Sequence, residues 1–111
     1  RVELNLGVKY NNEFFGKANG REMFFNFPRL VQHAASTRPL CAGSIIGSGT
    51  VSNEDESVGS SCLAEKRMLE KIKTGEFITP FMKVNDTIEI EVFDKNGQSV
   101  FGKISQKVVK A

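Results

Sequence analysis

The most constraining feature of this chain is a stretch near its C-terminus in which apolar and charged residues alternate. Ile88, Ile90 and Val92 fall on one side of an extended segment and are separated by acidic residues. This period of two is typical of a strand with one buried and one solvated face. The dipeptide Asn96-Gly97 follows and predicts a β-hairpin with a two-residue type I′ turn, which needs positive φ at both positions.

The return strand of this hairpin raises a question of register. After a two-residue turn, Ile90 would face Lys103 and the apolar face would break. One extra residue at Gly102 would bring Ile90 opposite Ile104, and glycine suits the backbone of such a bulge. We therefore predict a β-bulge at Gly102.

The first residues predict a second hairpin. Apolar residues alternate over residues 2–8, residues 10–13 include two asparagines that tolerate a left-handed turn, and Phe14 resumes an extended segment. Because the chain opens on Arg1 and is already strand-like there, we expect it to be part of a longer protein. Apolar surface along residues 2–8 and 23–27 is then expected to be exposed.

Two short helices are expected between the hairpins. Asn26 can cap a helix that takes Pro28 in its first turn and ends ahead of Pro39. Residues 62–73 have a helical apolar pattern, and Gly75 stands where a C-terminal cap would be. These elements predict an α+β fold that is mainly β: a mixed, curled sheet of hairpins with two short helices.

Charge and cysteine content exclude several functions. The chain has 15 Lys and Arg against 13 Asp and Glu, a net charge of +2, so it lacks the basic footprint of nucleic-acid binding. No apolar run reaches the length of a membrane span, so neither nucleic acid nor membrane is an expected partner. Cys41 and Cys62 lack the spacing of a zinc site and are interpreted as reduced thiols in small core or turn positions.

The most distinctive candidate for binding is the glycine-rich loop over residues 47–50. Residues 43–51 are expected to form a short buried strand that runs into this loop. Gly49 lets the backbone approach an anion, and the hydroxyls of Ser48 and Thr50 add donors for a carboxylate or phosphate. A tight turn between strands is the alternative interpretation, since the loop lacks the lysine of a P-loop.

The carboxylates offer weaker candidates. Residues 54–56 and the pair Glu89 and Glu91 could attract a divalent cation, but the pair lies on the polar face of the predicted strand and is interpreted as solvated. Glu65 stands near the start of the second helix, where it could act as a base beside a histidine or simply favour the helix dipole. From the residues alone the second interpretation is better. His33 is interpreted as structural or exposed.

The order and spacing of several short motifs along the chain, most clearly from Leu40 onward, are distinctive. These motifs are the small-residue run 43–51, the stretch Gly59–Arg67, the dipeptides Gly75-Glu76 and Asn85-Asp86, and the segments 79–82 and 101–104. In this order and spacing they resemble the C-terminal part of the fumarylacetoacetate hydrolase family, nearest to its 2-keto-4-pentenoate hydratase and 2-oxohepta-3-ene-1,7-dioate hydratase-like branch.

The resemblance implies a metal-dependent enzyme, a hydrolase or lyase, that acts between carbonyl-bearing carbons of dicarbonyl or 2-oxo acid substrates. The reaction is hydrolysis, hydration, isomerisation or decarboxylation, according to the member. A divalent cation, Mg²⁺ or Ca²⁺, chelates the substrate oxygens and stabilises the enolate. By the same resemblance Thr50, in its loop with Ser48 and Gly49, binds the substrate carboxylate. Glu65 corresponds to the glutamate that activates water together with an upstream histidine.

The chain departs from the family pattern in two ways, and these limit which part of the family's active site it can supply. The family's metal ligands, catalytic histidine and lysine lie upstream of the region that this chain resembles, so no metal ligand is expected within it. Extra residues also separate Gly59 from Glu65. Residues 1–111 are therefore expected to form the C-terminal part of a catalytic domain and part of the family's β-roll. The isolated chain is expected to be inactive.

The parent protein is expected to be a cytoplasmic homodimer in aromatic catabolism. A non-enzymatic β-rich binding module and a catalytically silent family member are the alternatives.

Overall fold

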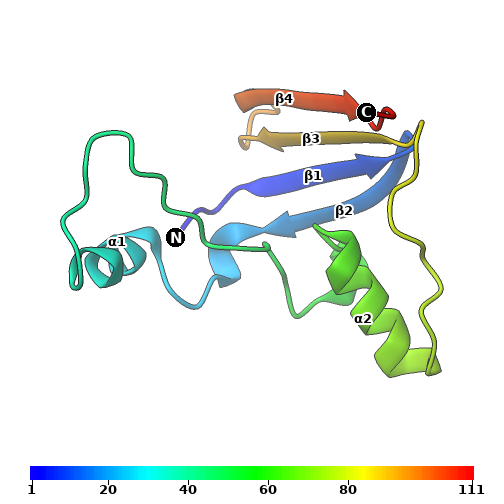
Figure 1. The fold of residues 1–111 in the computed structure, drawn as a ribbon, viewed down its shortest axis with the longest axis horizontal. Coiled ribbons are helices and arrows are strands. Elements are labelled where there is room, and N and C mark those ends of the chain that lie inside the picture. The colour runs from blue at the N-terminus through cyan, green and yellow to red at the C-terminus, as the bar shows by residue number, and fades with distance from the viewer.

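The computed structural model describes all 111 residues and contains one four-stranded sheet with two α-helices (Figure 1). In chain order the elements are β1 (Asn5–Tyr10), β2 (Glu13–Asn19), the 3₁₀-helix η1 (Gly20–Glu22), α1 (Phe27–Ala35), the 3₁₀-helix η2 (Glu56–Val58), α2 (Leu63–Thr74), β3 (Thr87–Phe93) and β4 (Ser99–Lys107). The strand order is β2-β1-β3-β4. The predicted α+β class, mainly β with two helices, is confirmed. All three strand pairings are antiparallel, so this sheet has no parallel pair.

The first hairpin has the turn that the asparagines predicted. Asn11 and Asn12 have φ of 51° and 66°, and Tyr10 pairs with Glu13 across a two-residue turn. Positive φ at both central residues is the requirement of a type I′ turn. Farther along, the register shifts by one residue and leaves Phe15 as the bulged residue of β2.

The second hairpin corrects one expectation and confirms another. Only Gly97 has positive φ, at 78°, and Asp94 pairs with Gln98 through a backbone bond of 2.9 Å, so the loop has three residues and is not type I′. The Asp94 carboxylate explains the difference, because it accepts the N–H groups of Asn96 and Gln98 at 2.8 Å each.

The predicted irregularity in the return strand is present, but it is larger than the one extra residue expected. Glu91 pairs with Lys103 and Phe93 with Ser99, so residues 100–102 lie opposite Val92 alone. Ile90 pairs with Ile104, the register shifts between Glu91 and Phe93, and Gly102 has a φ of 80°. The apolar face therefore continues across β3 and β4 as expected. On the opposite face Glu89 forms an ion pair with Lys103 at 2.8 Å, which confirms that this face is polar.

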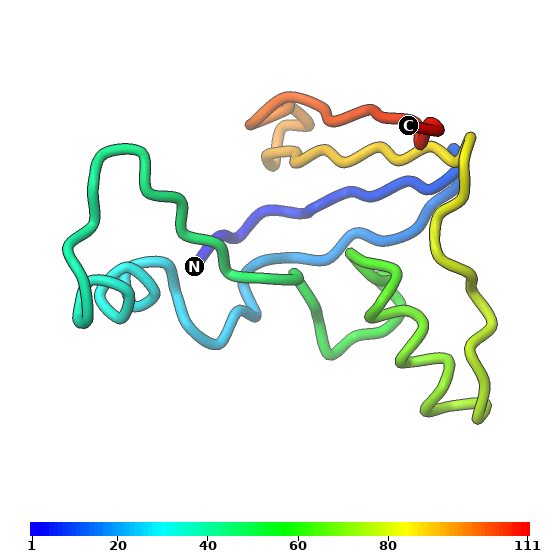
Figure 2. The backbone as a smooth tube through the Cα atoms, in the orientation of Figure 1, coloured from blue at the N-terminus to red at the C-terminus, as the bar shows by residue number.

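The segment between the two α-helices departs from the prediction. Residues 43–51 form neither a strand nor a buried segment: Ile45 is 93% exposed. No neighbouring strand lies beside this segment to pair with it, and Gly43 and Gly49 have positive φ of 89° and 82°. Together with α1 it extends from one end of the sheet as an arm (Figure 2).

The helix caps follow the sequence closely. The Asn26 side chain accepts the N–H of Arg29 at 3.0 Å, Pro28 lies in the first turn, and α1 ends at Ala35. Helix α2 ends at Thr74 and is capped by Gly75, which has a φ of 85° and donates its N–H to Lys71 O at 3.0 Å. Both helices therefore begin and end where local chemistry predicts.

Helix α2 lies beside β2 (Figure 1), because the segment that leads into the helix touches the backbone of β2 at two glycines. Gly16 and Gly59 form an isolated antiparallel bridge, and Ser60 donates its N–H to Phe15 O at 3.3 Å. A Cβ on Gly16 would lie 2.7 Å from the carbonyl carbon of Ser60, and one on Gly59 would lie 2.8 Å from Gly16 Cα. The Lys66 ammonium over the Phe15 ring, at 5.1 Å, adds a contact from the helix itself.

Helix α2 also holds the segment that follows it. The Arg67 guanidinium lies 4.7 Å from the Phe77 ring and 4.3 Å from the Phe81 ring. The Glu70 carboxylate accepts three hydrogen bonds, from Ile78 N at 3.1 Å, from Thr79 N at 2.8 Å and from Thr79 Oγ1 at 2.5 Å. These hydrogen bonds, chiefly those from Thr79, lower the pKa of Glu70 below its ordinary value of 4.5.

The core is small, and much apolar surface is open. Only Val8, Phe15 and Ala18 form a buried apolar core, and the accessible area of 8367 Å² exceeds the roughly 6,100 Å² typical of a compact protein of this mass. The radius of gyration is 16.1 Å, against about 13 Å for a compact domain of this length. The expected exposure is present at Phe24 and Phe25, which are 85% and 53% exposed. Over residues 2–8 the expectation is wrong for Val8, which is 2% exposed, whereas the other alternating apolar residues there are half-buried.

We predict that Gly16→Ala destabilises the protein by roughly 1–3 kcal/mol, because the added methyl group overlaps the backbone of Ser60. The free energy of unfolding from urea titration measures this. Gly47→Ala is the matched control, since nothing lies within 4 Å of that position. Equal stability of the two variants would show that the close approach of Gly16 and Gly59 does not hold α2 in place.

We predict that stability conferred by Glu70 depends on pH. Because folding lowers the pKa of this carboxylate, its contribution is present above the ordinary value of 4.5 and is lost as pH falls through the folded-state pKa. Glu70→Gln should lower the unfolding midpoint at neutral pH, and the difference from wild type should shrink as the solution is acidified below the ordinary value of 4.5. Glu76→Gln is the control, because the Glu76 carboxylate accepts no hydrogen bond. A constant difference across pH would contradict the prediction.

Candidate functional site

The glycine-rich loop and the start of α2 lie side by side, joined by three side-chain hydrogen bonds. Thr50 Oγ1 donates to Cys62 Sγ at 3.6 Å, and Ser61 Oγ donates to Val51 O at 2.5 Å. Ser52 Oγ donates to Oε1 of Glu65. The structure thus brings Thr50, predicted to bind substrate, close to the helix start that carries Glu65, the predicted base.

The start of α2 uses a thiol where a hydroxyl is usual. Cys62 is the N-cap residue, and its Sγ accepts the backbone N–H of Glu65 at 3.3 Å. Glu65 reaches back in turn, and its Oε2 accepts Ser61 N at 3.1 Å. This reciprocal arrangement resembles a capping box. Cys62 therefore has the turn position that its sequence context predicted, while Cys41 is exposed.

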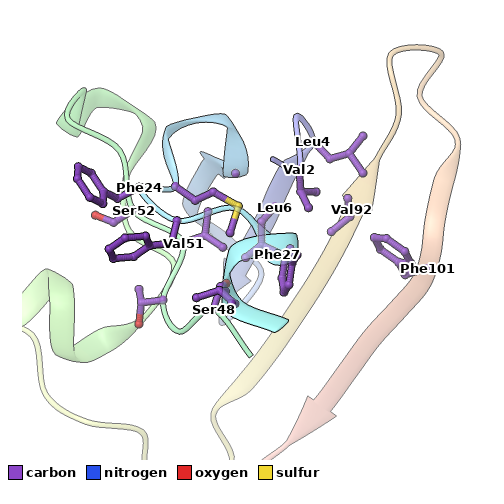
Figure 3. Close-up of a pocket in the computed structure, with 15 residues that line it drawn as sticks. Val2, Leu4, Leu6, Phe24, Phe27, Ser48, Val51, Ser52, Val92 and Phe101 are labelled. Carbon is purple, nitrogen blue, oxygen red and sulfur yellow. The ribbon is translucent and has the colours of Figure 1, made fainter. Parts of the chain in front are cut away.

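A groove of about 450 Å³ opens on the apolar face beside the loop (Figure 3). Its walls are apolar and come from the start of the chain, the segment around α1, and the strands β3 and β4; they include Leu4, Leu6, Phe24, Phe27, Val92 and Phe101. Ser48, Thr50 and Ser52 supply the only polar side chains of this lining. The groove therefore has three hydroxyl-bearing residues at one side and an apolar surface elsewhere.

The predicted site residues divide between the groove and its border. Ser48 and Thr50 line it, whereas Gly49 and Glu65 do not. Glu65 is half-buried and is connected to the groove through the hydroxyl of Ser52, a residue that the sequence interpretation did not single out. Ser52 carries no motif of its own, so only its contact with Glu65, 13 residues away, marks it.

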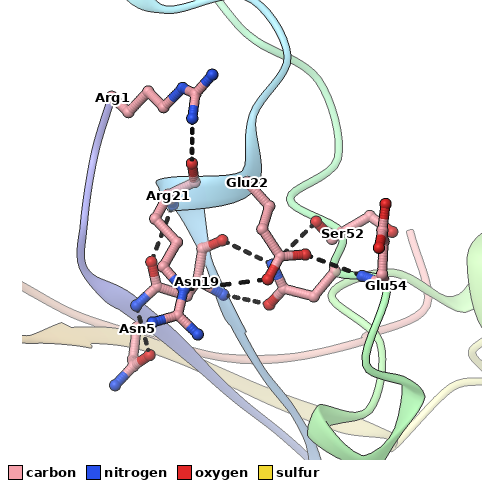
Figure 4. Close-up of polar contacts among 8 residues, drawn as sticks. Arg1, Asn5, Asn19, Arg21, Glu22, Ser52 and Glu54 are labelled. Atoms are coloured by element: carbon pink, nitrogen blue, oxygen red, sulfur yellow. Dashed lines mark hydrogen bonds and ion pairs between the residues drawn. The ribbon is translucent and has the colours of Figure 1, made fainter.

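The loop that carries Ser52 is anchored to the end of β2 (Figure 4). The Asn53 side-chain amide pairs with the backbone of Asn19 in both directions, accepting Asn19 N at 2.7 Å and donating to Asn19 O at 2.9 Å. Glu54 donates its N–H to Glu22 Oε2 at 2.9 Å. These bonds hold the loop against the sheet independently of α2.

The other candidates have structural roles. Asp55 caps η2 by accepting Ser57 N at 2.9 Å, and the hydrogen bonds from Ser57 lower the Asp55 pKa below its usual range. Glu56 forms an ion pair with Lys73. His33 is exposed on α1, does not line the groove and makes no hydrogen bond to Glu65.

Two kinds of feature are absent from the structure: a metal-binding cluster and a membrane-spanning helix. No group of three or more His, Cys, Asp or Glu side chains is arranged to hold a metal ion. Neither α-helix has the length and apolar character needed to cross a membrane.

Comparison with known proteins agrees with the motifs. Residues 1–109 match the sequence profile of the family described as fumarylacetoacetate (FAA) hydrolase C-terminal. A fumarylacetoacetase of Caenorhabditis elegans is 31% identical to the chain over 120 residues. The match covers 99% of this chain and 29% of that relative, so the chain spans less than a third of the length of the curated relative it matches.

We predict that Cys62→Ser preserves or raises stability, whereas Cys62→Ala lowers it by about 0.5–2 kcal/mol, because serine is a strong N-cap acceptor and alanine has no acceptor. Thermal unfolding followed by circular dichroism measures both. Cys41→Ala is the control, because Cys41 is exposed and its Sγ makes no hydrogen bond. A Cys62→Ala variant as stable as wild type would contradict the capping role.

Proposed function

This chain belongs to the fumarylacetoacetate hydrolase family, and from that premise we propose that residues 1–111 form the C-terminal part of an enzyme acting on dicarbonyl or 2-oxo acid substrates. The observation that carries the proposal is the position of Thr50 and Ser48 in the groove, with Glu65 joined to it through Ser52. Among the reactions of the family we favour hydrolysis of a carbon–carbon bond, because the matched relative is a fumarylacetoacetase.

In this proposal the loop over residues 48–50 binds the carboxylate of the substrate. Ser48 and Thr50 line the groove, and the backbone N–H groups of residues 48–50 donate no hydrogen bond within the chain. Gly49, at a φ of 82°, has no Cβ that would limit the approach of an anion. Donors of this kind stabilise negative charge on a substrate oxygen.

Glu65 is the proposed general base. Its carboxylate accepts the hydroxyl of Ser52, which lines the groove, and the backbone N–H of Ser61, so both of its oxygens are held and its orientation is limited. A general base must lie within hydrogen-bond reach of the proton that it removes, directly or through one water molecule. Since His33 is on α1 and makes no hydrogen bond to Glu65, we propose that the partner histidine belongs to the part of the protein outside residues 1–111.

The divalent metal, Mg²⁺ or Ca²⁺, also requires residues outside this chain. The acidic side chains present do not fit a metal site, because no three potential ligands converge. Glu89 is paired with Lys103, and Glu56 with Lys73. We propose that the parent is metal-dependent through ligands elsewhere in its sequence, and that it is a cytoplasmic homodimer in catabolism of aromatic compounds.

We predict that the full-length protein cleaves 2,4-dioxo acids and that chelation by EDTA abolishes the reaction. In that protein Thr50→Val should raise KM about tenfold or more, because a hydrogen bond to a charged group is lost. Glu65→Gln should lower kcat by about a hundredfold or more, because a general base is lost. Loss of the substrate's ultraviolet absorbance measures turnover.

Thr87→Val and Glu76→Gln are the matched controls, since both residues lie away from the groove. Absence of turnover across a panel of 2,4-dioxo and 2-oxo acids, with folded full-length protein, would favour a silent family member or a binding module. Normal kcat in Glu65→Gln would reject this residue as the base.

A further inference from the structure

We propose that Ser52 is a positioning residue that orients the Glu65 carboxylate toward the groove. The inference rests on the proposed function, because it takes Glu65 as the base. Ser52 is the point where the groove lining meets this carboxylate: its hydroxyl donates to Oε1, and the residue itself lines the groove.

The two oxygens of Glu65 are held from two different segments. Oε2 accepts Ser61 N at 3.1 Å, and Ser61 directly precedes the N-cap residue of α2. Oε1 accepts the hydroxyl of Ser52, which lies on the opposite segment, 13 residues earlier. Ser61 N alone would leave the carboxylate free to rotate about this single contact, whereas the second donor defines the plane of the carboxylate.

Helix capping does not require the Ser52 hydroxyl. The N-cap bond is made by Cys62 Sγ, and the reciprocal bond is made by Glu65 with Ser61 N. Ser52 is exposed and fills no core position. The start of the helix is therefore capped without this hydrogen bond, and the bond serves to orient the Glu65 carboxylate.

The position of Ser52 is itself defined by its neighbours (Figure 4). The Asn53 amide pairs with the Asn19 backbone at 2.7 and 2.9 Å, and Glu54 N binds Glu22 Oε2 at 2.9 Å. The segment that carries the Ser52 hydroxyl is thus anchored by hydrogen bonds to the end of β2. Flexible donors position a charged group poorly, and donors on an anchored backbone position it well.

Ser52 also couples the two functions proposed for this site. Thr50, the proposed carboxylate-binding residue, is two residues away on the same segment, and both residues line the groove. One short stretch of backbone therefore sets both the anchor of the substrate and the orientation of the base. A small displacement of this stretch would misplace the reacting atoms relative to the base, which is costly in catalysis.

The test is steady-state kinetics of the full-length protein with 2,4-dioxo acid substrates. We expect Ser52→Ala to lower kcat by about tenfold to a hundredfold, with KM within about twofold of wild type, because the lost bond is to a charged group. Ser52→Thr keeps a hydroxyl and should restore kcat to within about threefold of wild type. In the Glu65→Gln background, Ser52→Ala should have no further effect on kcat, since the residues act as a unit.

Ser105→Ala is the matched control, because Ser105 Oγ donates to Glu89 at 3.4 Å in a second serine–glutamate pair, on the polar face of the sheet. We expect its kcat and unfolding midpoint to equal those of wild type. Ser52→Ala should unfold at the same temperature as this control.

Different failures separate the two proposals. If Glu65→Gln loses activity while Ser52→Ala keeps wild-type kcat, the positioning role is wrong and the proposed function stands. A Ser52→Ala loss that persists in full in the Glu65→Gln background, or that Ser52→Thr does not rescue, shows a general structural effect and also overturns the positioning role. Full activity of Glu65→Gln, or no turnover by the wild-type protein, overturns the proposed function and this inference with it.

Discussion

The backbone contact between Gly16 and Gly59 is the constraint on which the rest of the structure depends. It is the place where the sheet and the segment leading into α2 touch without intervening side chains. Ser61, Cys62 and Glu65 follow within six residues, so their distance from the sheet is set by this approach. A side chain at either glycine would overlap backbone atoms and move the whole segment.

A second anchor acts on the other side of the candidate site. Asn53 uses its amide as a peptide group would, and ties the loop that carries Thr50 and Ser52 to Asn19 at the end of β2. The two anchors use different residues of β2, and the segments that they hold are joined by the hydrogen bond from Ser52 to Glu65. The candidate site therefore lies where two irregular segments meet, and each of these segments is anchored to β2. The sheet itself does not carry the polar residues of the site.

The polar contacts of the site stand beside a large open apolar surface. The groove has hydroxyls at one side and aromatic and aliphatic side chains over the remainder, with no charged residue in its lining. In these 111 residues the buried core is only a few side chains, so specific backbone contacts and caps carry an unusual share of the organisation. The chain belongs to the fumarylacetoacetate hydrolase family and spans 29% of the length of the matched relative.

The sequence by itself determined the elements whose causes are local. Alternation at Ile88 to Val92, the paired asparagines of the first turn, the caps at Asn26 and Gly75, and the bulge at Gly102 all depend on near neighbours, and all are present. It also indicated Thr50 and Glu65 through family resemblance. Only the tertiary structure decided that residues 43–51 form no strand, because strand formation requires a partner that the local pattern does not reveal. It alone brought Ser52 to Glu65, since their contact depends on two anchors distant in sequence.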